Sequence, residues 1–196
     1  MAHYMVELVL ANRPVLVIGG GKVARRKIAG VLICGAVVTV LSPVLEETVA
    51  EWAAQGRIHW RPEPFTPECL DDPPRPALVF AAAGDAERNR RIALACRERG
   101  LLCNSADDPA ASGFLVTAMH HQGPVTLGVG TGGLSPAASR HIKDLLVERM
   151  GENWGEIVRE LGKMREEIQQ KIPDPAERER YWRELVMRRI EPPPLG

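Results

Sequence analysis

Three consecutive glycines directly after a short β-branched run set the strongest limit on the architecture of this chain. The run is Val15-Leu16-Val17-Ile18, and the residues that follow, Gly19-Gly20-Gly21-Lys22-Val23-Ala24, fit G-x-G-x-x-A at the start of a helical stretch. Glycines in this position permit a tight turn and let a pyrophosphate approach the first turn of the helix. We therefore predict a dinucleotide-binding strand–turn–helix unit. The alternative interpretation is a glycine-rich turn without a ligand.

Strand-like and helix-like stretches alternate through the first half of the chain. This alternation predicts an α/β fold with a Rossmann-like, doubly wound and mostly parallel sheet. Asp85 is placed to cap one helix, and Gly35 and Gly100 are placed to end two others. The expected strands are residues 15–18, 37–41, 58–60, 77–83 and 101–104, and the expected helices are residues 22–34, 45–54 and 85–99.

The pattern changes after Asp107. Residues 114–120 and 125–129 read as two strands joined by a turn at residues 121–124, and Ser135 opens a helix that reaches residue 150. Further helical patterns cover residues 154–171 and 175–190, before a proline-rich tail at residues 192–194. We predict three domains: an NAD-binding Rossmann domain (1–112), a small strand-helix unit for dimerisation and the substrate cleft (113–150), and a C-terminal helical domain (151–196).

The charge balance argues against a nucleic-acid partner. Lysine and arginine number 25, as do aspartate and glutamate, so no global basic field attracts a polyanion. No stretch reaches the roughly 18 apolar residues of a membrane span, which predicts no membrane partner. The four cysteines form no C-x-x-C pair and are expected to be reduced thiols in the cytoplasm.

The segment after the second expected strand favours NAD over NADP. It begins with Ser42, whose hydroxyl can hydrogen-bond a ribose, where dinucleotide folds often carry an acid. Residues 41–56 contain three glutamates and no arginine or lysine, so the additional phosphate of NADP would meet no nearby cation in the sequence. At the carboxyl edge of a parallel sheet this segment meets the glycine turn, Gly84-Asp85 and residues 104–107.

Four stretches together resemble one enzyme family, the precorrin-2 dehydrogenase and sirohydrochlorin ferrochelatase module of siroheme synthase. The N-x-x-D motif, followed about two dozen residues later by a glycine-rich loop and Ser-Pro, is the most specific part. We expect a stand-alone form, without the methyltransferase to which the module is fused in some bacteria. The four stretches are VIGGGKVARRK (17–27), VTVLSP (38–43), NSADDP (104–109) and GTGGLSP (130–136).

The resemblance implies a homodimer in which residues 113–150 interlock with the second copy. It also implies an enzyme that oxidises precorrin-2 to sirohydrochlorin with NAD; some members insert ferrous iron as well. Asp107, the aspartate of N-x-x-D, is the candidate for proton handling, and Thr131 stands in the loop where a serine often lines the substrate cleft. Without the resemblance, an aspartate beside Asp-Pro is more simply a turn residue.

The expected site residues fall into two groups. The cofactor-binding candidates are Gly19, Gly20, Gly21, Lys22, Val23, Ala24, Ser42, Pro43, Val44, Ala83, Gly84 and Asp85. The substrate-binding candidates are Asn104, Thr131, Gly132, Ser135, Arg25 and Arg140, with Arg26, Lys27, His141 and Lys143 as further cations for a polycarboxylate substrate.

Neither a structural zinc nor any other bound metal is expected. His120 and His121 are adjacent, so in a strand they point to opposite faces and cannot form a compact pair of ligands. A different class of function stays open, namely a non-catalytic NAD-responsive binding module. Such a module would need the glycine turn, whereas Asp107 and the Thr131 loop would be incidental.

Overall fold

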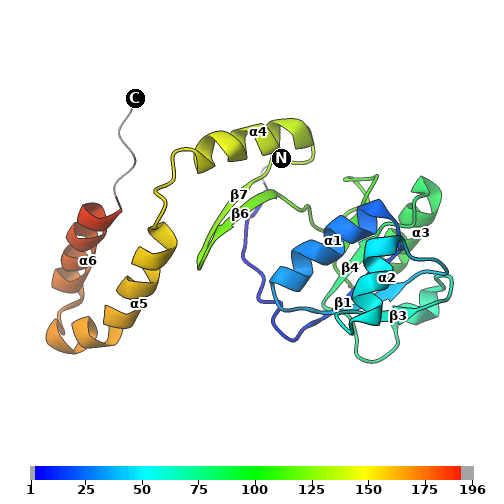
Figure 1. Ribbon diagram of the computed structural model, residues 1–196, viewed down its shortest axis with the longest axis horizontal. Helices are drawn as coiled ribbons and strands as arrows, with labels where there is room; N and C mark the ends of the chain where they lie inside the picture. The colour runs from blue at the N-terminus through cyan, green and yellow to red at the C-terminus, as the bar shows by residue number, and fades with distance from the viewer. Residues whose placement is uncertain (1–2, 191–196) are drawn as a thin grey trace. The chain divides into compact units, whose positions relative to one another are not determined.

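The computed structural model describes residues 3–190 of the chain. The chain divides into two compact units, the first reaching Val116 and the second starting at Thr117. Figure 1 shows the elements of each unit, and the two units are described separately below. The three-domain division expected from the sequence stays a prediction.

The first unit contains a five-stranded, fully parallel sheet, as the alternating pattern predicts. The strand order β3-β2-β1-β4-β5 places β1 at the centre, and the chain crosses from one half of the sheet to the other between β3 and β4. This is the doubly wound arrangement, in which ligands bind at the carboxyl ends of the strands where the order reverses. The strands are β1 (Pro14–Ile18), β2 (Val37–Leu41), β3 (His59–Arg61), β4 (Leu78–Ala81) and β5 (Cys103–Ser105).

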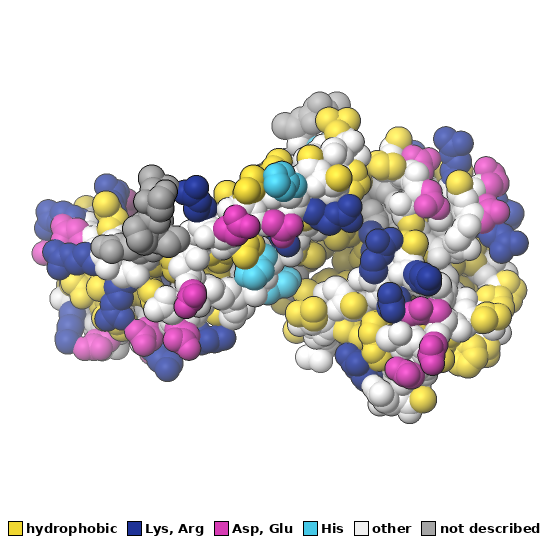
Figure 2. Space-filling view, turned by 45° about the horizontal axis from the view of Figure 1, so that its top comes forward, with side chains coloured by type: hydrophobic (Ala, Val, Ile, Leu, Met, Phe, Trp, Pro, Cys, Tyr) yellow, Lys and Arg dark blue, Asp and Glu magenta, His cyan; other side chains and the backbone are white. Residues whose placement is uncertain are grey.

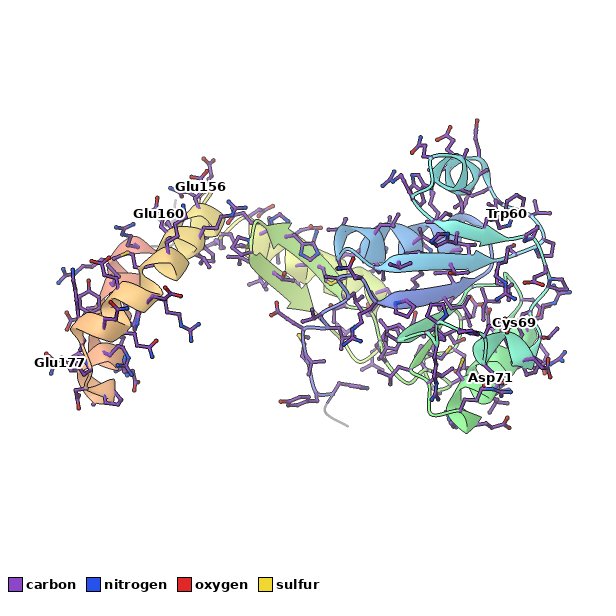
Figure 3. All side chains as sticks on the ribbon, turned by 90° about the horizontal axis from the view of Figure 1, so that it is seen from below. Trp60, Cys69, Asp71, Glu156, Glu160 and Glu177 are labelled. Carbon is purple, nitrogen blue, oxygen red and sulfur yellow. The ribbon has the colours of Figure 1, made fainter. Side chains whose placement is uncertain are left out.

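Alternate residues of the central strands face two separate apolar cores. Val15 and Val17 of β1 pack with helices α1 (Lys22–Ile33) and α2 (Glu47–Ala54). Leu16 and Ile18 face the other side and pack with α3 (Ala86–Glu98), which the sequence placed at residues 85–99. In Figure 3, the cyan helix α2 and the green helix α3 lie on opposite sides of the sheet. Burial on both faces explains why β1 is a continuous apolar run.

The proline-rich loop before β4 is more ordered than the sequence indicated. It contains a short 3₁₀ helix, η1 (Pro67–Leu70), and its Leu70 is completely buried in the α3 core. Near the same edge, Trp60 of β3 donates from its indole to the carbonyl of Ser42 at 2.9 Å. The loop therefore contributes a buried side chain to the core under α3, in addition to joining β3 to β4.

The second unit begins with an antiparallel hairpin, β6 (Ala118–Gln122) and β7 (Val125–Val129). The expected strand start at residue 114 was wrong. Phe114 stays with the first unit because its ring packs edge-on against Phe80, with 5.5 Å between the centroids. Its carbonyl also accepts a hydrogen bond from the Asn104 side chain at 3.0 Å.

Three helices complete the second unit: α4 (Pro136–Val147), α5 (Trp154–Lys171) and α6 (Pro175–Arg189). Ser135 caps α4 as expected, since its hydroxyl accepts from the amide of Ala138. Acidic and basic side chains are interspersed over α5 and α6, as the face in Figure 2 shows, and Arg189 pairs with Glu160 at 2.7 Å. The expected proline tail lies outside the described residues. Within residues 3–190, no helix combines the length and apolar character that a membrane crossing requires.

Candidate functional site

Two of the three glycines after β1 are required by the protein's own packing. Gly19 has φ +121°, and a Cβ built there would lie 2.0 Å from the carbonyl oxygen of Ala82. A Cβ on Gly20 would lie 2.2 Å from the carbonyl oxygen of Val44. The turn is thus wedged between the ends of β4 and β2, and any side chain at either position would displace backbone.

Gly21 is different, because the protein itself does not require a glycine there. Its φ is −91°, and a Cβ built on it would meet nothing within 4 Å. In the G-x-G-x-x-A pattern this is the position at which the backbone approaches the pyrophosphate. The open space beside Gly21 therefore fits a dinucleotide, and a side chain there would fill it.

The N-terminus of α1 is prepared for an anion. Gly21 is its N-cap and supplies no side-chain hydrogen bond, and the first turn contains no acidic residue. The caps of α3, α4 and α6, by contrast, are the side chains of Asp85, Ser135 and Asp174. The helices α2 and α5 also lack a side-chain cap, but each has a glutamate in its first turn. The first amides of a helix have no acceptor within the helix, and its dipole favours negative charge. A phosphate group is the natural partner of the α1 terminus.

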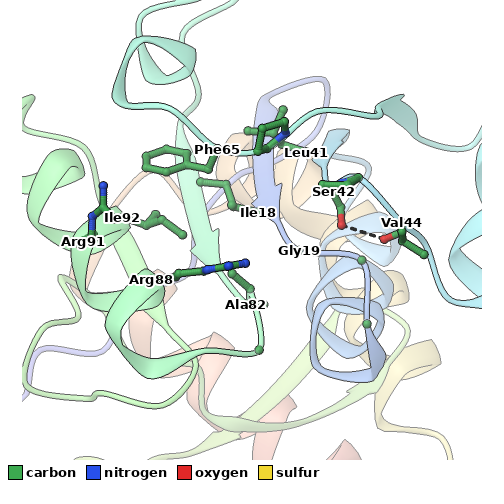
Figure 4. Close-up of a pocket in the computed structure, with 16 residues that line it drawn as sticks. Ile18, Gly19, Leu41, Ser42, Val44, Phe65, Ala82, Arg88, Arg91 and Ile92 are labelled. Atoms are coloured by element: carbon green, nitrogen blue, oxygen red, sulfur yellow. Dashed lines mark hydrogen bonds between the residues drawn. The ribbon is translucent and has the colours of Figure 1, made fainter.

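A cavity of about 470 Å³ opens at this edge of the sheet. Figure 4 shows it between the glycine turn, the loop after β2 and the start of α3. The Ser42 hydroxyl donates to the carbonyl of Val44 at 2.7 Å, which fixes the loop after β2. Of the expected cofactor residues, those that line the cavity are Gly19, Gly20, Gly21, Ser42, Pro43, Val44, Ala83 and Gly84.

The other expected cofactor residues have structural positions outside this lining. Ala24 is completely buried where α1 packs on the sheet, and Lys22 and Val23 precede it in the first turn. Asp85 accepts a hydrogen bond from the Arg88 amide at 2.9 Å and caps α3. Contact of any of these residues with a cofactor stays a prediction.

Two cavity-lining arginines were missed by sequence reasoning. Arg88 and Arg91 stand one helical turn apart on α3 and both line the cavity. In Figure 4, Arg88 extends toward the Gly19 side, whereas Arg91 lies beside Phe65. The preference for NAD was predicted from residues 41–56 alone, whereas these two cations come from a helix on the other half of the sheet. Their i, i+3 spacing just after the Asp85 cap was the available signal.

Asp107 and Asp108 have separate tasks. Asp108 holds the turn, since its Oδ1 accepts from the amides of Ala110 and Ala111 at 3.0 and 3.1 Å. Asp107 is exposed, and its Oδ2 accepts a hydrogen bond of 2.7 Å from Nδ2 of Asn89. The simple turn role expected for an aspartate in this motif therefore belongs to Asp108. A catalytic role of Asp107 stays a prediction.

Asn89 connects Asp107 to the cavity, and sequence reasoning did not single it out. Its side chain is completely buried, and its Oδ1 accepts from the amide of Ala83 at 2.8 Å. Ala83 lines the cavity. The carboxylate of Asp107 is therefore one side chain away from the backbone of the candidate cofactor site.

Three expected substrate residues of the first unit are engaged in internal contacts. Asn104 is 5% exposed and donates to Phe114, and its Oδ1 has no hydrogen-bond partner within the described part of the chain. Arg25 pairs with Glu46 at 3.3 Å. Lys27 lies over the Phe80 ring, and burial, followed by the charge of Arg26, lowers the pKa of its amine.

In the second unit, the Thr131 hydroxyl organises the loop before α4. It lies 2.9 Å from the Ser139 hydroxyl and 3.1 Å from the Ser135 carbonyl, and it accepts from the Ser135 amide at 3.2 Å. Gly132 and Gly133 adopt positive φ values of 63° and 81°, which a residue with a side chain rarely adopts. Arg140 is exposed on α4. The loop is thus built around Thr131, and its contact with substrate stays a prediction.

The two adjacent histidines lie in β6, where the strand sends them to opposite faces. His121 is within 3.1 Å of the Thr126 hydroxyl, and His120 is half-buried on the other face. Among residues 3–190, no three His, Cys, Asp or Glu side chains gather as a metal site.

Comparisons with known proteins agree with this geometry. Residues 6–118 match the family described as "Putative NAD(P)-binding", and residues 153–191 match the "Sirohaem synthase dimerisation region". Siroheme synthase 3 of Aeromonas hydrophila is 32% identical over 177 residues, which are 90% of this chain and 37% of the relative. Siroheme synthase 1 of Halorhodospira halophila is 33% identical over 187 residues, which are 94% of this chain and 38% of the relative. The chain thus spans less than two fifths of the length of these relatives.

A solved structure covers the chain more completely. The precorrin-2 dehydrogenase SirC superposes with a TM-score of 0.70 and 26% identity, and the match covers 95% of this chain and 98% of that one. The dimerisation match falls on α5 and α6. The expectation that residues 113–150 interlock with a second copy stays a prediction.

Proposed function

The chain belongs to the precorrin-2 dehydrogenase and siroheme synthase family, and from this membership we propose that it oxidises precorrin-2 to sirohydrochlorin with NAD in siroheme biosynthesis. One structural observation carries the proposal. The Asp107 carboxylate is joined through Asn89 to Ala83, which lines the cavity beside the glycine turn. The candidate proton acceptor and the candidate dinucleotide site therefore lie at the same edge of the sheet.

The first unit has residues suited to the pyrophosphate and to a ribose of the cofactor. The amides at the start of α1 would bind the pyrophosphate, for which Gly21 leaves room. The hydroxyl of Ser42 already donates to Val44, so it would accept a hydrogen bond from a ribose hydroxyl. Arg88 supplies positive charge from α3. When bound, NAD supplies a hydride acceptor.

Asp107 would accept the proton that the macrocycle loses together with the hydride. Each two-electron oxidation of the macrocycle removes a hydride and a proton, and the proton needs an acceptor. The Asp107 carboxylate is exposed, and Asn89 occupies only one of its oxygens. It would therefore take the proton that leaves the macrocycle and return it to solvent.

Ferrous iron is a further substrate that the proposal includes. Insertion of iron requires two pyrrole nitrogens to lose their protons, and the same carboxylate could accept them one after the other, releasing the first to solvent before it takes the second. The acting form would be a homodimer, with α5 and α6 as its dimerisation region. The four cysteines are all unpaired thiols, which supports a place in the cytoplasm.

The test is an anaerobic incubation of the purified chain with precorrin-2 and NAD, followed by absorbance of sirohydrochlorin. Addition of ferrous or cobalt ion then tests metal insertion in the same sample. Formation of sirohydrochlorin that depends on both NAD and protein supports the proposal. Tight NAD binding without turnover would instead support the non-catalytic NAD-responsive module.

A further inference from the structure

Asn89 on α3 has contacts that its place in the core does not require. We propose that Asn89 is a positioning residue, which holds the Asp107 carboxylate for proton transfer and fixes it relative to the cofactor cavity. This inference rests on the proposed dehydrogenase function. It adds one residue to that function, because the side-chain amide of Asn89 bonds both to the backbone of Ala83 after β4 and to the carboxylate of Asp107 after β5.

The orientation of the Asn89 side chain follows from its partners. The amide of Ala83 can only donate, so the oxygen of Asn89 faces it at 2.8 Å. The nitrogen of Asn89 therefore faces Asp107, and it donates to Oδ2 at 2.7 Å. A flipped amide would place a donor against a donor and an oxygen against a carboxylate, so only one arrangement satisfies both neighbours.

Burial makes these two bonds costly to lose. Asn89 is 0% exposed, and a buried amide that loses its hydrogen-bond partners destabilises the folded protein because its desolvation is no longer compensated. Its neighbours on the same face of α3, Ile92, Ala93 and Cys96, are apolar or nearly so. Simple packing would be satisfied by an apolar side chain at this position.

A purely structural role explains only half of the geometry. Acceptance from Ala83 satisfies a backbone amide at the end of β4, which any such role would predict. The backbone of the turn is already held by Asp108 through Ala110 and Ala111, and the bond from Asn89 to Asp107 joins two side chains without satisfying any backbone group. The bond to Asp107 instead fixes the rotamer of an exposed carboxylate. Oδ1 of Asp107 forms no hydrogen bond with the described residues and is the oxygen left to accept a proton.

The two ends of Asn89 can be separated by substitution. Asn89→Asp keeps the shape and the acceptor for Ala83 but replaces the donor that faces Asp107 with a second carboxylate, so that like charge acts on Asp107 together with the lost donation. Asn89→Ala removes both bonds. Each change is made in the wild-type chain and in Asp107→Asn, and kcat, KM for precorrin-2 and Kd for NAD are measured, the last from the change in the protein's tryptophan fluorescence. Cys96→Ala is the matched control, since it alters a buried residue of α3 that touches neither Ala83 nor Asp107 by hydrogen bonds.

If Asn89 acts through Asp107, Asn89→Asp lowers kcat by at least about tenfold, which is part of the ~100- to 10,000-fold contribution of a general base. The KM for precorrin-2 and the Kd for NAD stay within about threefold of wild type, the range of one weak hydrogen bond. In the Asp107→Asn background the same change causes no further loss of kcat, because the residue it positions is gone.

The exchanged variant Asn89→Asp/Asp107→Asn provides a second readout. In this variant the amide introduced at position 107 can donate to the carboxylate introduced at position 89. The hydrogen bond between the two positions is thereby restored, so Tm rises above that of Asn89→Asp alone. Turnover stays low, since the carboxylate is now buried on α3. Equal losses of kcat from Asn89→Asp in both backgrounds would overturn the positioning role and leave the dehydrogenase intact. A wild-type chain that forms no sirohydrochlorin would overturn the proposed function itself.

Discussion

The hydroxyl of Ser42 donates a hydrogen bond to the carbonyl of Val44, 2.7 Å away. Ser42 can therefore offer a ligand only its oxygen lone pairs, which accept a hydrogen bond from a ribose hydroxyl but not from a phosphate without protons. The acidic residues 46, 47 and 51 follow in the same segment.

From this arrangement we expect NAD to bind more tightly than NADP. Titration with the two nucleotides, followed by fluorescence, measures the preference. Ser42→Ala should weaken NAD by about three- to tenfold, the value of one neutral hydrogen bond, and change NADP less. Tighter binding of NADP would show that Arg88 or Arg91 reaches the additional phosphate and that the sequence argument from residues 41–56 was too local.

Gly21→Asp should abolish NAD binding and leave the fold intact. The built Cβ at this position meets no protein atom, whereas a carboxylate would crowd and repel the pyrophosphate. Gly20→Ala is the contrasting change, because its methyl group would collide with the Val44 carbonyl and lower Tm. Thermal melts and NAD titrations of both variants separate the two roles. Unaltered NAD affinity in Gly21→Asp would contradict the pyrophosphate assignment.

Arg88→Ala should weaken NAD by roughly 10- to 100-fold, the usual size of a hydrogen bond to a charged group, and most strongly at low salt. Arg97→Ala is a matched control, since Arg97 is exposed in the last turn of the same helix and does not line the cavity. Titrations at two salt concentrations give the comparison. If both variants bind NAD equally well, Arg88 is only a solvated residue of α3.

Asp107→Asn should keep the fold and NAD binding while turnover falls by ~100- to 10,000-fold. The new amide oxygen can still accept from Asn89, so little stability is lost. Assays of oxidation and of metal insertion show whether one base serves both reactions. A parallel fall in both rates indicates a shared base, and a greater fall in metal insertion indicates that oxidation depends mainly on positioning. Near-wild-type rates in both assays would reduce Asp107 to a loop residue.

The protein should sediment at about twice the mass of one chain. A two-stranded hairpin such as β6–β7 is marginal alone, and the single chain leaves Ile142, Leu145 and Leu146 of α4 partly exposed. Sedimentation velocity at micromolar concentration checks the expectation. An active monomer at that concentration would contradict it.

The sheet was predictable because its signals are local. Strand length, glycine ends and the Asp85 cap are each read from a few neighbouring residues, and the structure confirms the order of strands and helices that they indicate. The error at residue 114 has a nonlocal cause. Phe114 packs against Phe80, on another strand, and accepts a hydrogen bond from Asn104, ten residues earlier in the chain. The periodicity of residues 114–120 contains no information about such contacts.

The candidate site was predictable only where a motif marks it. The glycine turn and Asp107 carry recognisable patterns, whereas Arg88, Arg91 and Asn89 do not. These three residues appear as ordinary members of a charged helix, and the sheet topology alone brings them to the cavity or to Asp107. In a doubly wound sheet, the residues that face a ligand come from both halves of the sequence, so a search along one segment finds only part of the site.

The open space beside Gly21 also has a diagnostic consequence. A substitution at Gly19 or Gly20 is subject to selection for folding, since either side chain would strike the backbone. Position 21 is exempt from that selection, so its identity records only what the chain must bind. A homologous sequence that retains the first two glycines and carries a larger residue at the third would keep this architecture and have abandoned its nucleotide. A single substitution at position 21 can thus distinguish members of the family that bind the nucleotide from members that keep the fold and no longer bind it.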